Sequence, residues 1–168
     1  HEAAPKSKLF LNDYNACIPS KCDKIYKLVK KLKSDGVPIH GIGLQGHYNI
    51  NFPASEAIDN ALKKLSELEL DIQITEMDVS MYGYENRSTD IVCPSNNMIE
   101  RQKIFYDRTF EVYRKYKNVI SGVTLWGVAD DYTWLDEFPV YGRKDWPLLF
   151  DEKLQKKPAY EAVTCWER

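Results

Sequence analysis

Four short apolar segments alternate along the chain with four segments of helical periodicity, and this alternation constrains the fold more than any other feature. The apolar segments span residues 8–14, 39–46, 70–79 and 119–128. Such alternation is typical of βαβ units, in which parallel strands form one sheet and helices pack against it. The sequence therefore predicts an α/β fold built from four consecutive βα units.

The segments that follow the predicted strands place apolar residues at the spacing of a single helix face. The first face consists of Ile25, Leu28, Val29 and Leu32, the second of Ile58, Ala61, Leu62, Leu65 and Leu68, and the third of Met98, Phe105, Val112, Tyr113 and Tyr116. Ser20 and Asp23 resemble a capping box for the first helix. A last helix is expected from Lys157 to Trp166.

The length of the chain limits which parallel architecture it forms alone. Its 168 residues are fewer than the roughly 200 of the smallest complete (β/α)8 barrels. GxxxxGK[ST] does not occur, and the single GxGxxG match, GIGLQG at residues 41–46, lies inside the second apolar segment rather than in a loop after a strand. This argues against a nucleotide-binding doubly wound sheet. Polar and aromatic residues instead follow each strand, at the edge where barrel enzymes build their active sites. We therefore expect half of a (β/α)8 TIM barrel.

Charge and residue spacing exclude several classes of function. The 23 Lys and Arg residues against 25 Asp and Glu residues give a net charge of −2, so no overall field favours nucleic acids or anionic membranes. No apolar run approaches the roughly 18 residues of a membrane span. His1, His40 and His47 form no i, i+4 pair, so no metal or cofactor is expected. Cys17 and Cys22 form either a disulfide or two free thiols.

Two carboxylates end the third apolar segment, in the sequence ITEMD. Because strand side chains alternate between faces, Glu76 and Asp78 are expected on one face, the face of Ile72 and Ile74. A carboxylate in this position is costly to bury without partners. Glu76 is therefore either a nucleophile or general base, with Asp78 orienting a neighbour, or one member of a solvated or salt-bridged pair.

Gln45 and His47 end the second apolar segment, in the sequence LQGHY. If the second and third strands are neighbours, His47 lies within hydrogen-bonding reach of Glu76. Such a contact fixes the tautomer of the imidazole and holds the charge of the carboxylate. The alternative is a structural histidine with no part in chemistry.

The first apolar segment ends in the sequence LNDYN, which contains Asn12, Tyr14 and Asn15. Amides and a phenol suit the binding of neutral, hydroxyl-rich ligands. For Asn15 the alternative is a local role in the turn that follows.

Trp126 and Trp134 bracket the last long loop, in the sequence LWGVADDYTWL. Indole faces stack on the apolar faces of sugar rings, and the indole N–H is available to a hydroxyl. The alternative places both tryptophans in a core or a domain seam. Asp130 and Asp131 bind a substrate hydroxyl, a loop amide or neither.

Five stretches of the sequence occur together in a recognisable order. They are LFLNDYN, GIGLQGHYN, ITEMDV, GVTLWGVADDYTW and PLLFDEKLQKKPAYEAV, and they extend from Leu9 to Val163. Together they resemble family 10 glycoside hydrolases, the (β/α)8 endo-β-1,4-xylanases. The resemblance implies a secreted, retaining xylanase that needs no cofactor and acts on xylan or xylo-oligosaccharides. Residues 1–168 would be the C-terminal half of its barrel, strands five to eight.

The resemblance also implies roles for the residues at the strand ends. Glu76 would be the nucleophile, His47 its hydrogen-bonding partner, and Asp78 part of the same network. The substrate-binding residues would be Asn12, Tyr14, Asn15, Gln45, Trp126 and Trp134. Among these, the two tryptophans would form the wall of the subsite that holds the glycosyl unit.

One essential group is missing from this sequence. Retaining glycosidases use two carboxyls about 5–5.5 Å apart, and the acid/base Glu of the family lies in an Asn-Glu pair that ends the fourth strand. No Asn-Glu pair occurs in this chain, and residues 1–8 are expected to be the tail of the preceding helix. The expected partner is the N-terminal half of the barrel, as a separate or cleaved chain. Alternatives are a noncatalytic polysaccharide-binding or structural half, a hydrolase of another β-1,4-glycan, and a homodimer of half barrels.

Overall fold

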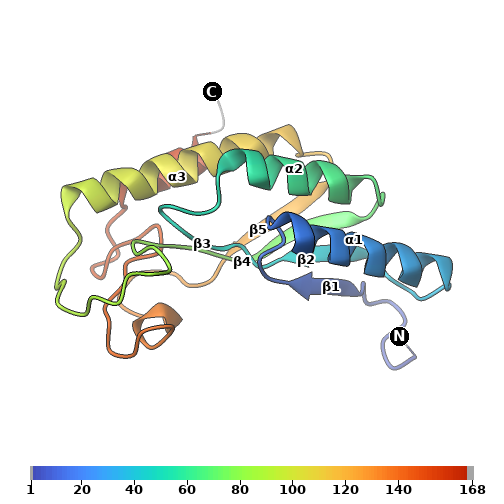
Figure 1. The fold of residues 1–168 in the computed structure, drawn as a ribbon, viewed down its shortest axis with the longest axis horizontal. Helices are drawn as coiled ribbons and strands as arrows, with labels where there is room; N and C mark the ends of the chain where they lie inside the picture. The colour runs from blue at the N-terminus through green and yellow to red at the C-terminus, as the bar shows by residue number, and fades with distance from the viewer. Residues whose placement is uncertain (1, 166–168) are drawn as a thin grey trace.

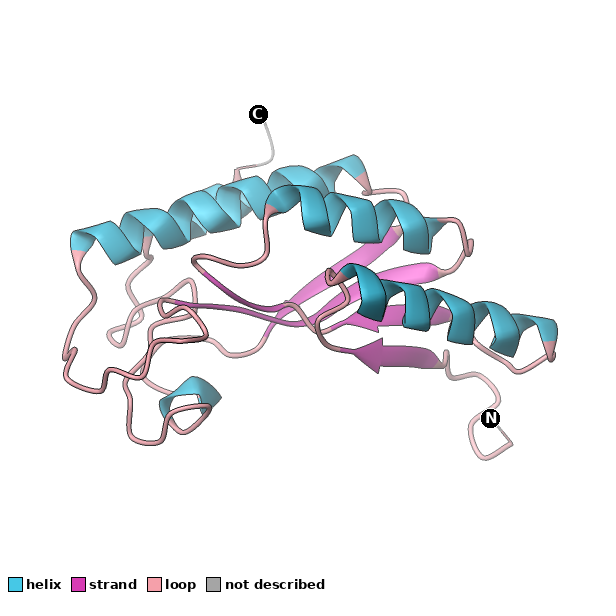
Figure 2. Cartoon of the chain, in the orientation of Figure 1, coloured by secondary structure: helices cyan, strands magenta, loops and turns pink. Residues whose placement is uncertain are grey.

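The structure, a computed structural model, describes residues 2–165 and is a single parallel sheet with helices on one side (Figures 1 and 2). The strands are β1 (Phe10–Asp13), β2 (Gly41–Leu44), β3 (His47–Asn49), β4 (Asp71–Ser80) and β5 (Ile120–Leu125). The helices are α1 (Pro19–Ser34), α2 (Ser55–Ser66), α3 (Asn96–Lys115) and α4 (Pro158–Thr164), with a 3-10 turn, η1, at Trp134–Asp136. The predicted alternation of strands and helices is therefore confirmed.

The strands follow one another across the sheet in the order in which they occur along the chain. β1 pairs with β2, β2 pairs with β4, and β5 pairs with the other side of β4, all in parallel. The short strand β3 continues the line of β2 and also pairs with β4. Among the described residues β1 and β5 each have one neighbouring strand, so both borders of the sheet are open.

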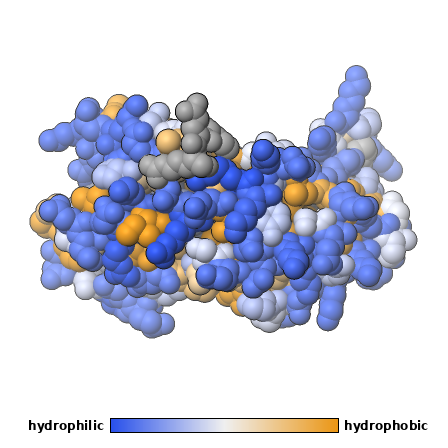
Figure 3. Space-filling model, turned by 90° about the horizontal axis from the view of Figure 1, so that it is seen from above, coloured by the Kyte–Doolittle hydropathy of each residue, from blue (hydrophilic) through white to orange (hydrophobic). Residues whose placement is uncertain are grey.

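The main core lies between the sheet and the helices. Leu62 and Leu65 of α2 and Ile72 of β4 are completely buried in it. The predicted face of α1 is partly wrong, because Leu28 is 46% exposed and Cys22 faces the core instead. The buried face of α1 therefore consists of Cys22, Ile25 and Val29, and Leu28 lies outside it. The outer surface of the helical layer is mostly hydrophilic, with scattered apolar patches (Figure 3).

The start of α1 differs from the prediction. No capping box forms, since the residue before the helix is Ile18 and its side chain makes no capping hydrogen bond. Pro19 begins the helix, where its missing N–H is not needed. The predicted cap residue Asp23 instead pairs with Lys64 of α2.

The sequence predicts helical structure at both ends of the chain. Residues 2–8 form turns rather than a helix tail, since Pro5 lacks the N–H that a helix interior needs. The last helix ends at Thr164, and the predicted end at Trp166 lies outside the described residues.

Cys17 and Cys22 are buried free thiols, and burial raises the pKa of Cys17 to about 11. No helix among residues 2–165 has the length and apolar character to cross a membrane.

β4 contains one residue more than the strands on either side of it. β2 pairs with β4 up to Leu44 and Ile74, and β3 resumes the pairing at His47 and Asp78. The register with β5 shifts in the same stretch, between Ile74 and Met77. Two residues of one strand that oppose a single residue of its partner form a β-bulge. The bulge therefore lies at the carboxyl end of the central strand.

The bulge reverses the faces to which the later residues of β4 point. Ile72 and Ile74 lie in the core, and Met77 takes the next core position. Glu76 and Asp78 consequently turn away from the helices and line a cleft. The prediction that these carboxylates share a face is confirmed. The prediction that they share it with Ile72 and Ile74 is wrong, because simple alternation does not account for the extra residue.

The positions of two leucines can be tested by truncation. Leu65→Ala is expected to lower the free energy of unfolding by about 2–5 kcal/mol, because it leaves a cavity in the core. Leu28→Ala removes the same atoms from an exposed position and is expected to cost less than about 1 kcal/mol. Urea denaturation of both variants measures the difference. Equal losses would contradict the placement of Leu28 outside the core.

Candidate active site

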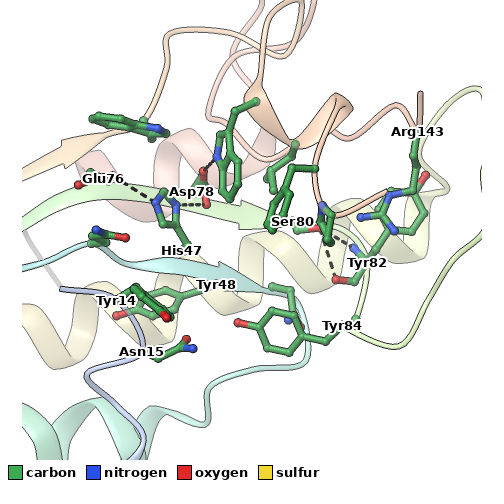
Figure 4. Close-up of a pocket in the computed structure, with 18 of the residues that line it drawn as sticks. Tyr14, Asn15, His47, Tyr48, Glu76, Asp78, Ser80, Tyr82, Tyr84 and Arg143 are labelled. Carbon is green, nitrogen blue, oxygen red and sulfur yellow. Dashed lines mark hydrogen bonds and ion pairs between the residues drawn. The ribbon is translucent and has the colours of Figure 1, made fainter. Parts of the chain in front are cut away.

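The polar residues at the strand ends line one cleft with a volume of about 710 Å³ (Figure 4). The sequence-predicted residues in its wall are Tyr14, Asn15, Gln45, His47, Glu76, Asp78, Trp126 and Trp134. Asn12 lies beside them and contacts Glu76 directly. The structure therefore brings all nine predicted residues to the same edge of the sheet, since the carboxyl ends of parallel strands meet there.

Glu76 is held through both oxygens of its carboxylate. The amide of Asn12 donates a hydrogen bond of 2.7 Å to Oε1, and Nε2 of His47 lies 3.3 Å from Oε2. The backbone N–H of Glu76 also donates to the carbonyl of Gln45. The side chain of Glu76 keeps 16% of its surface exposed. The carboxylate is therefore fixed in position and still accessible from the cleft.

His47 lies between two carboxylates, as the dashed lines in Figure 4 show. Its Nδ1 is 3.0 Å from Oδ1 of Asp78, and its Nε2 faces Glu76. Burial lowers the pKa of His47, but the hydrogen bonds and charges of Asp78 and Glu76 outweigh burial and raise the pKa above 6.5. Only the protonated ring can donate to both carboxylates at once. The predicted contact between His47 and Glu76 is confirmed.

Asp78 connects the histidine to the tryptophan loop. Its side chain is 1% exposed, and its second oxygen accepts a hydrogen bond of 2.7 Å from the indole N–H of Trp134. The ring of Trp134 lies 4.9 Å from the ring of His47 and stacks on Phe138 at 5.4 Å. Because the indole N–H of Trp134 already donates to Asp78, Trp134 presents its ring to the cleft but no free hydrogen-bond donor.

Trp126 is the more exposed of the two tryptophans. Nearly half of its surface, 47%, is open to solvent. Its ring lies edge-on to His47, with 6.4 Å between the ring centroids. An exposed indole beside a fixed carboxylate is a suitable platform for a sugar ring.

Tyr14 and Asn15 also line the cleft (Figure 4). Tyr14 is 55% exposed, and the ammonium group of Lys21 lies 4.6 Å from the centre of its ring. Asn15 has a φ of +55°, and its carbonyl accepts from the N–H of Ile18. Asn15 therefore serves the turn after β1 as well as lining the cleft.

Asp130 lies outside the cleft. It is 1% exposed, forms a 2.7 Å ion pair with Lys157, and accepts from the backbone N–H of Leu148. Burial raises the pKa of Asp130 to about 6, although the Lys157 ammonium acts in the opposite direction. Of the predicted alternatives, Asp130 therefore follows the loop-amide one. Asp131 is exposed and lines a separate hollow behind Trp126.

Several residues of the cleft are not among those predicted from the sequence. They are Tyr82, Tyr84 and Arg87 from the loop after β4, and Phe138 and Arg143 from the loop after β5. The guanidinium of Arg143 lies 4.1 Å from the centre of the Tyr82 ring. The sequence MYGY directly after the third predicted strand was the available signal, because aromatic residues just beyond a strand end lie at the active edge of such a sheet.

Two other carboxylates line the cleft in the part of the chain that the structure describes. Asp78 is buried and occupied by His47 and Trp134, and Glu85 lies in the exposed loop after β4. Across residues 2–165 no three His, Cys, Asp or Glu side chains are arranged to hold a metal ion. Glu76 is therefore the one cleft carboxylate in this range that is both fixed by side-chain partners and open to the cleft.

The sequence matches a known protein family over almost its whole length. The model of Glycosyl hydrolase family 10 matches residues 1–165. An endo-1,4-beta-xylanase of Geobacillus stearothermophilus is 49% identical over 163 residues, which are 97% of this chain and 49% of that protein. An exoglucanase of Acetivibrio thermocellus, XynX, is 44% identical over 167 residues, 97% of this chain and 14% of that protein.

The fold also matches solved structures closely. A family 10 xylanase of Thermobacillus composti superposes with a TM-score of 0.95 at 52% identity, covering 97% of this chain and 53% of that one. A xylanase of Paenibacillus barcinonensis, XynB, gives a TM-score of 0.95 at 45% identity, covering 97% and 49%. The chain therefore spans about half the length of these two xylanases and of the Geobacillus stearothermophilus xylanase.

The charge network around His47 predicts a pH dependence. Because the folded state raises the pKa of His47, its stabilising contribution is present below about pH 6.5 and is lost as the pH rises through the folded-state pKa. Asp78→Asn removes one carboxylate, and with it a hydrogen bond and a negative charge, and is expected to lower this pKa. NMR titration of the His47 ring protons measures the change. Asp131→Asn, the same substitution at an exposed position, serves as the control, and an unshifted His47 in Asp78→Asn would contradict the network.

Proposed function

The chain belongs to glycosyl hydrolase family 10, and we propose that it supplies the nucleophile side of the active site of a retaining endo-β-1,4-xylanase. The observation that carries the proposal is the position of Glu76, held through both oxygens by Asn12 and His47 and open to a cleft with tryptophan walls. The fold is that of the family, a (β/α)8 barrel, of which this chain forms four βα units.

Hydrolysis proceeds in two displacements in this proposal. Glu76 attacks the anomeric carbon while a carboxylic acid on the complementary side protonates the leaving oxygen. The product of this step is a covalent glycosyl-enzyme. The same acid, now a carboxylate, takes a proton from water, and the water oxygen displaces Glu76 from the anomeric carbon.

The neighbours of Glu76 suit it to this role. An attacking carboxylate must be ionised and must not rotate away from the anomeric carbon. Asn12 and His47 occupy one oxygen each, which restricts rotation of the carboxylate. Asp78 in turn orients the His47 ring through Nδ1. His47 and Asp78 are thus positioning residues for the nucleophile.

Xylan or a xylo-oligosaccharide is the proposed substrate. The exposed faces of Trp126 and Trp134 would hold the glycosyl unit, and Tyr14 would contact the leaving-group side. Gln45 and Asn15 complete the polar lining. We also propose that the protein is secreted, since its polymeric substrate lies outside cells.

The acid/base is proposed to come from the complementary N-terminal βα units, of which residues 1–168 would be the C-terminal counterpart. The open borders of the sheet at β1 and β5 offer two strands for pairing with these units. The complementary units are on a separate, cleaved or continuous chain, and without them the described residues have a nucleophile and no matching acid. The alternative of a noncatalytic sugar-binding half predicts that adding the complementary units produces no hydrolysis.

Hydrolysis of a different β-1,4-glycan is the second candidate. It is favoured by the 44% identity to a relative named as an exoglucanase. Xylose and glucose polymers differ in the hydroxymethyl group of each ring, so the subsite walls decide between them. Product analysis with xylan and with cellulose separates the two candidates.

Glu76→Ala in the assembled barrel tests the nucleophile assignment. Turnover of an aryl β-xylobioside is expected to fall by a factor on the order of 10⁴ or more, because the covalent step is lost. Added azide is expected to restore turnover and to give a glycosyl azide of inverted configuration. Glu85→Ala, which removes another carboxylate of the same cleft, is the matched control. Full activity of Glu76→Ala would refute the assignment.

Trp126→Ala tests the proposed wall. The loss of one stacked ring is expected to raise KM for xylo-oligosaccharides about 10-fold, which corresponds to roughly 1.4 kcal/mol of binding free energy. Tyr132→Ala removes a nearby aromatic ring that is 84% exposed and absent from the cleft. Steady-state kinetics of the two variants compare the positions, and equal KM values would remove Trp126 from the binding surface.

A further inference from the structure

The contact between Asn12 and Glu76 spans an intervening strand. Asn12 lies on β1 and Glu76 on β4, and β2 runs between them. The residue of β2 opposite Asn12 is Gly43. A Cβ at this glycine would lie 2.5 Å from Oδ1 of Asn12 and 3.0 Å from a methyl carbon of Thr75. The Asn12 amide therefore reaches β4 only because position 43 has no side chain.

Two consecutive residues of β4 hold the two ends of that amide. The hydroxyl of Thr75 donates a 2.7 Å hydrogen bond to Oδ1 of Asn12, and Nδ2 of Asn12 donates a 2.7 Å hydrogen bond to Glu76. In a regular strand, neighbouring residues point to opposite faces. Thr75 and Glu76 both reach Asn12 because the β-bulge lies between Ile74 and Met77. The bulge thus builds a closed Thr75–Asn12–Glu76 arrangement.

We propose that Thr75 and Gly43 are positioning residues that keep the donor end of the Asn12 amide aimed at Glu76 throughout both displacements. This inference rests on the function proposed above for Glu76. An asparagine amide has a donor end and an acceptor end, and a half-turn would place its oxygen against the carboxylate. The Thr75 hydroxyl donates to the oxygen end, and Gly43 leaves the space that this end of the amide occupies.

The need for such a hold arises from the changing charge of Glu76. As a free carboxylate, Glu76 attracts the Asn12 N–H through a charge-assisted hydrogen bond. In the glycosyl-enzyme, Glu76 is a neutral ester, so this attraction weakens. When water attacks the anomeric carbon, the bond from that carbon to Glu76 breaks and its electron pair returns to the carboxylate. The water proton passes to the acid/base residue, and the amide must already point at the returning charge.

The effect of Thr75 is therefore expected mainly in the second displacement. Free enzyme and the first transition state both carry charge on Glu76, so a weakened hydrogen bond affects the two similarly. The covalent intermediate carries no charge on Glu76. A weakened hydrogen bond therefore raises the free energy of the second transition state relative to the intermediate that precedes it. Slower hydrolysis of the intermediate lowers kcat and KM together and leaves kcat/KM unchanged.

Thr75→Val and Thr75→Ser form the test pair in the assembled barrel, with dinitrophenyl β-xylobioside as the substrate. Valine keeps the shape and loses the hydroxyl, and serine keeps the hydroxyl. In Thr75→Val we expect kcat and KM to fall about 10-fold together, with a larger burst of dinitrophenolate. Thr75→Ser is expected to stay within about 2-fold of the parent protein. Gly43→Ala, which crowds the amide, is expected to follow Thr75→Val.

Crystal structures of the same variants give a readout that is independent of turnover. We expect the 2.7 Å contact between Nδ2 of Asn12 and Oε1 of Glu76 to lengthen in Thr75→Val and to keep its length in Thr75→Ser. An unchanged contact in Thr75→Val, equal losses in both variants, or a fall in kcat/KM at constant KM would overturn it. Absence of any burst in the parent protein, together with an active Glu76→Ala variant, would instead overturn the nucleophile assignment and leave the structural comparison decisive for Thr75.

Discussion

A single strand has to serve two environments along ten residues, and the β-bulge in β4 makes this possible. The first part of the strand packs isoleucines against the helices, while its end presents carboxylates to a cleft. One extra residue changes the face on which the later side chains lie and still lets Met77 and Val79 fill the core. Without it, Glu76 would point into the apolar layer, where an unpaired charge is strongly disfavoured.

The bulge is effective because the neighbouring strands are adapted to it. β2 ends at Leu44 and β3 begins at His47, and Gly46 between them has a φ of +81°, a conformation that favours glycine. This interruption lets His47 come opposite Asp78. From there a continuous hydrogen-bonded path runs from Glu76 through His47 and Asp78 to Trp134. Glu76, the proposed nucleophile, and the aromatic ring of Trp134 are therefore parts of one hydrogen-bonded network.

The sequence was sufficient for the order of the elements and for the residues that meet at the sheet edge. Periodicity identified the helices, and polar residues such as Glu76 and His47 stood at strand ends, where parallel topology brings them together. Alternation alone did not reveal the bulge, because a register shift depends on pairing with two other strands. The packing of helices and loops against the sheet likewise determines that Leu28 is exposed and that Arg143 lines the cleft. Those contacts join residues far apart in the sequence and have no local pattern.

The buried ion pair between Asp130 and Lys157 lies away from the cleft, yet it constrains the segment that carries part of the cleft wall. The two residues are separated by 27 positions, and the segment between them includes Trp134 and Phe138. Their contact acts as a noncovalent cross-link that closes this segment into a loop and reduces the number of conformations open to it. The conformational entropy of this segment is therefore lost during folding and does not have to be lost again when a ligand binds. The aromatic wall is in this sense preorganised by a buried interaction outside the cleft.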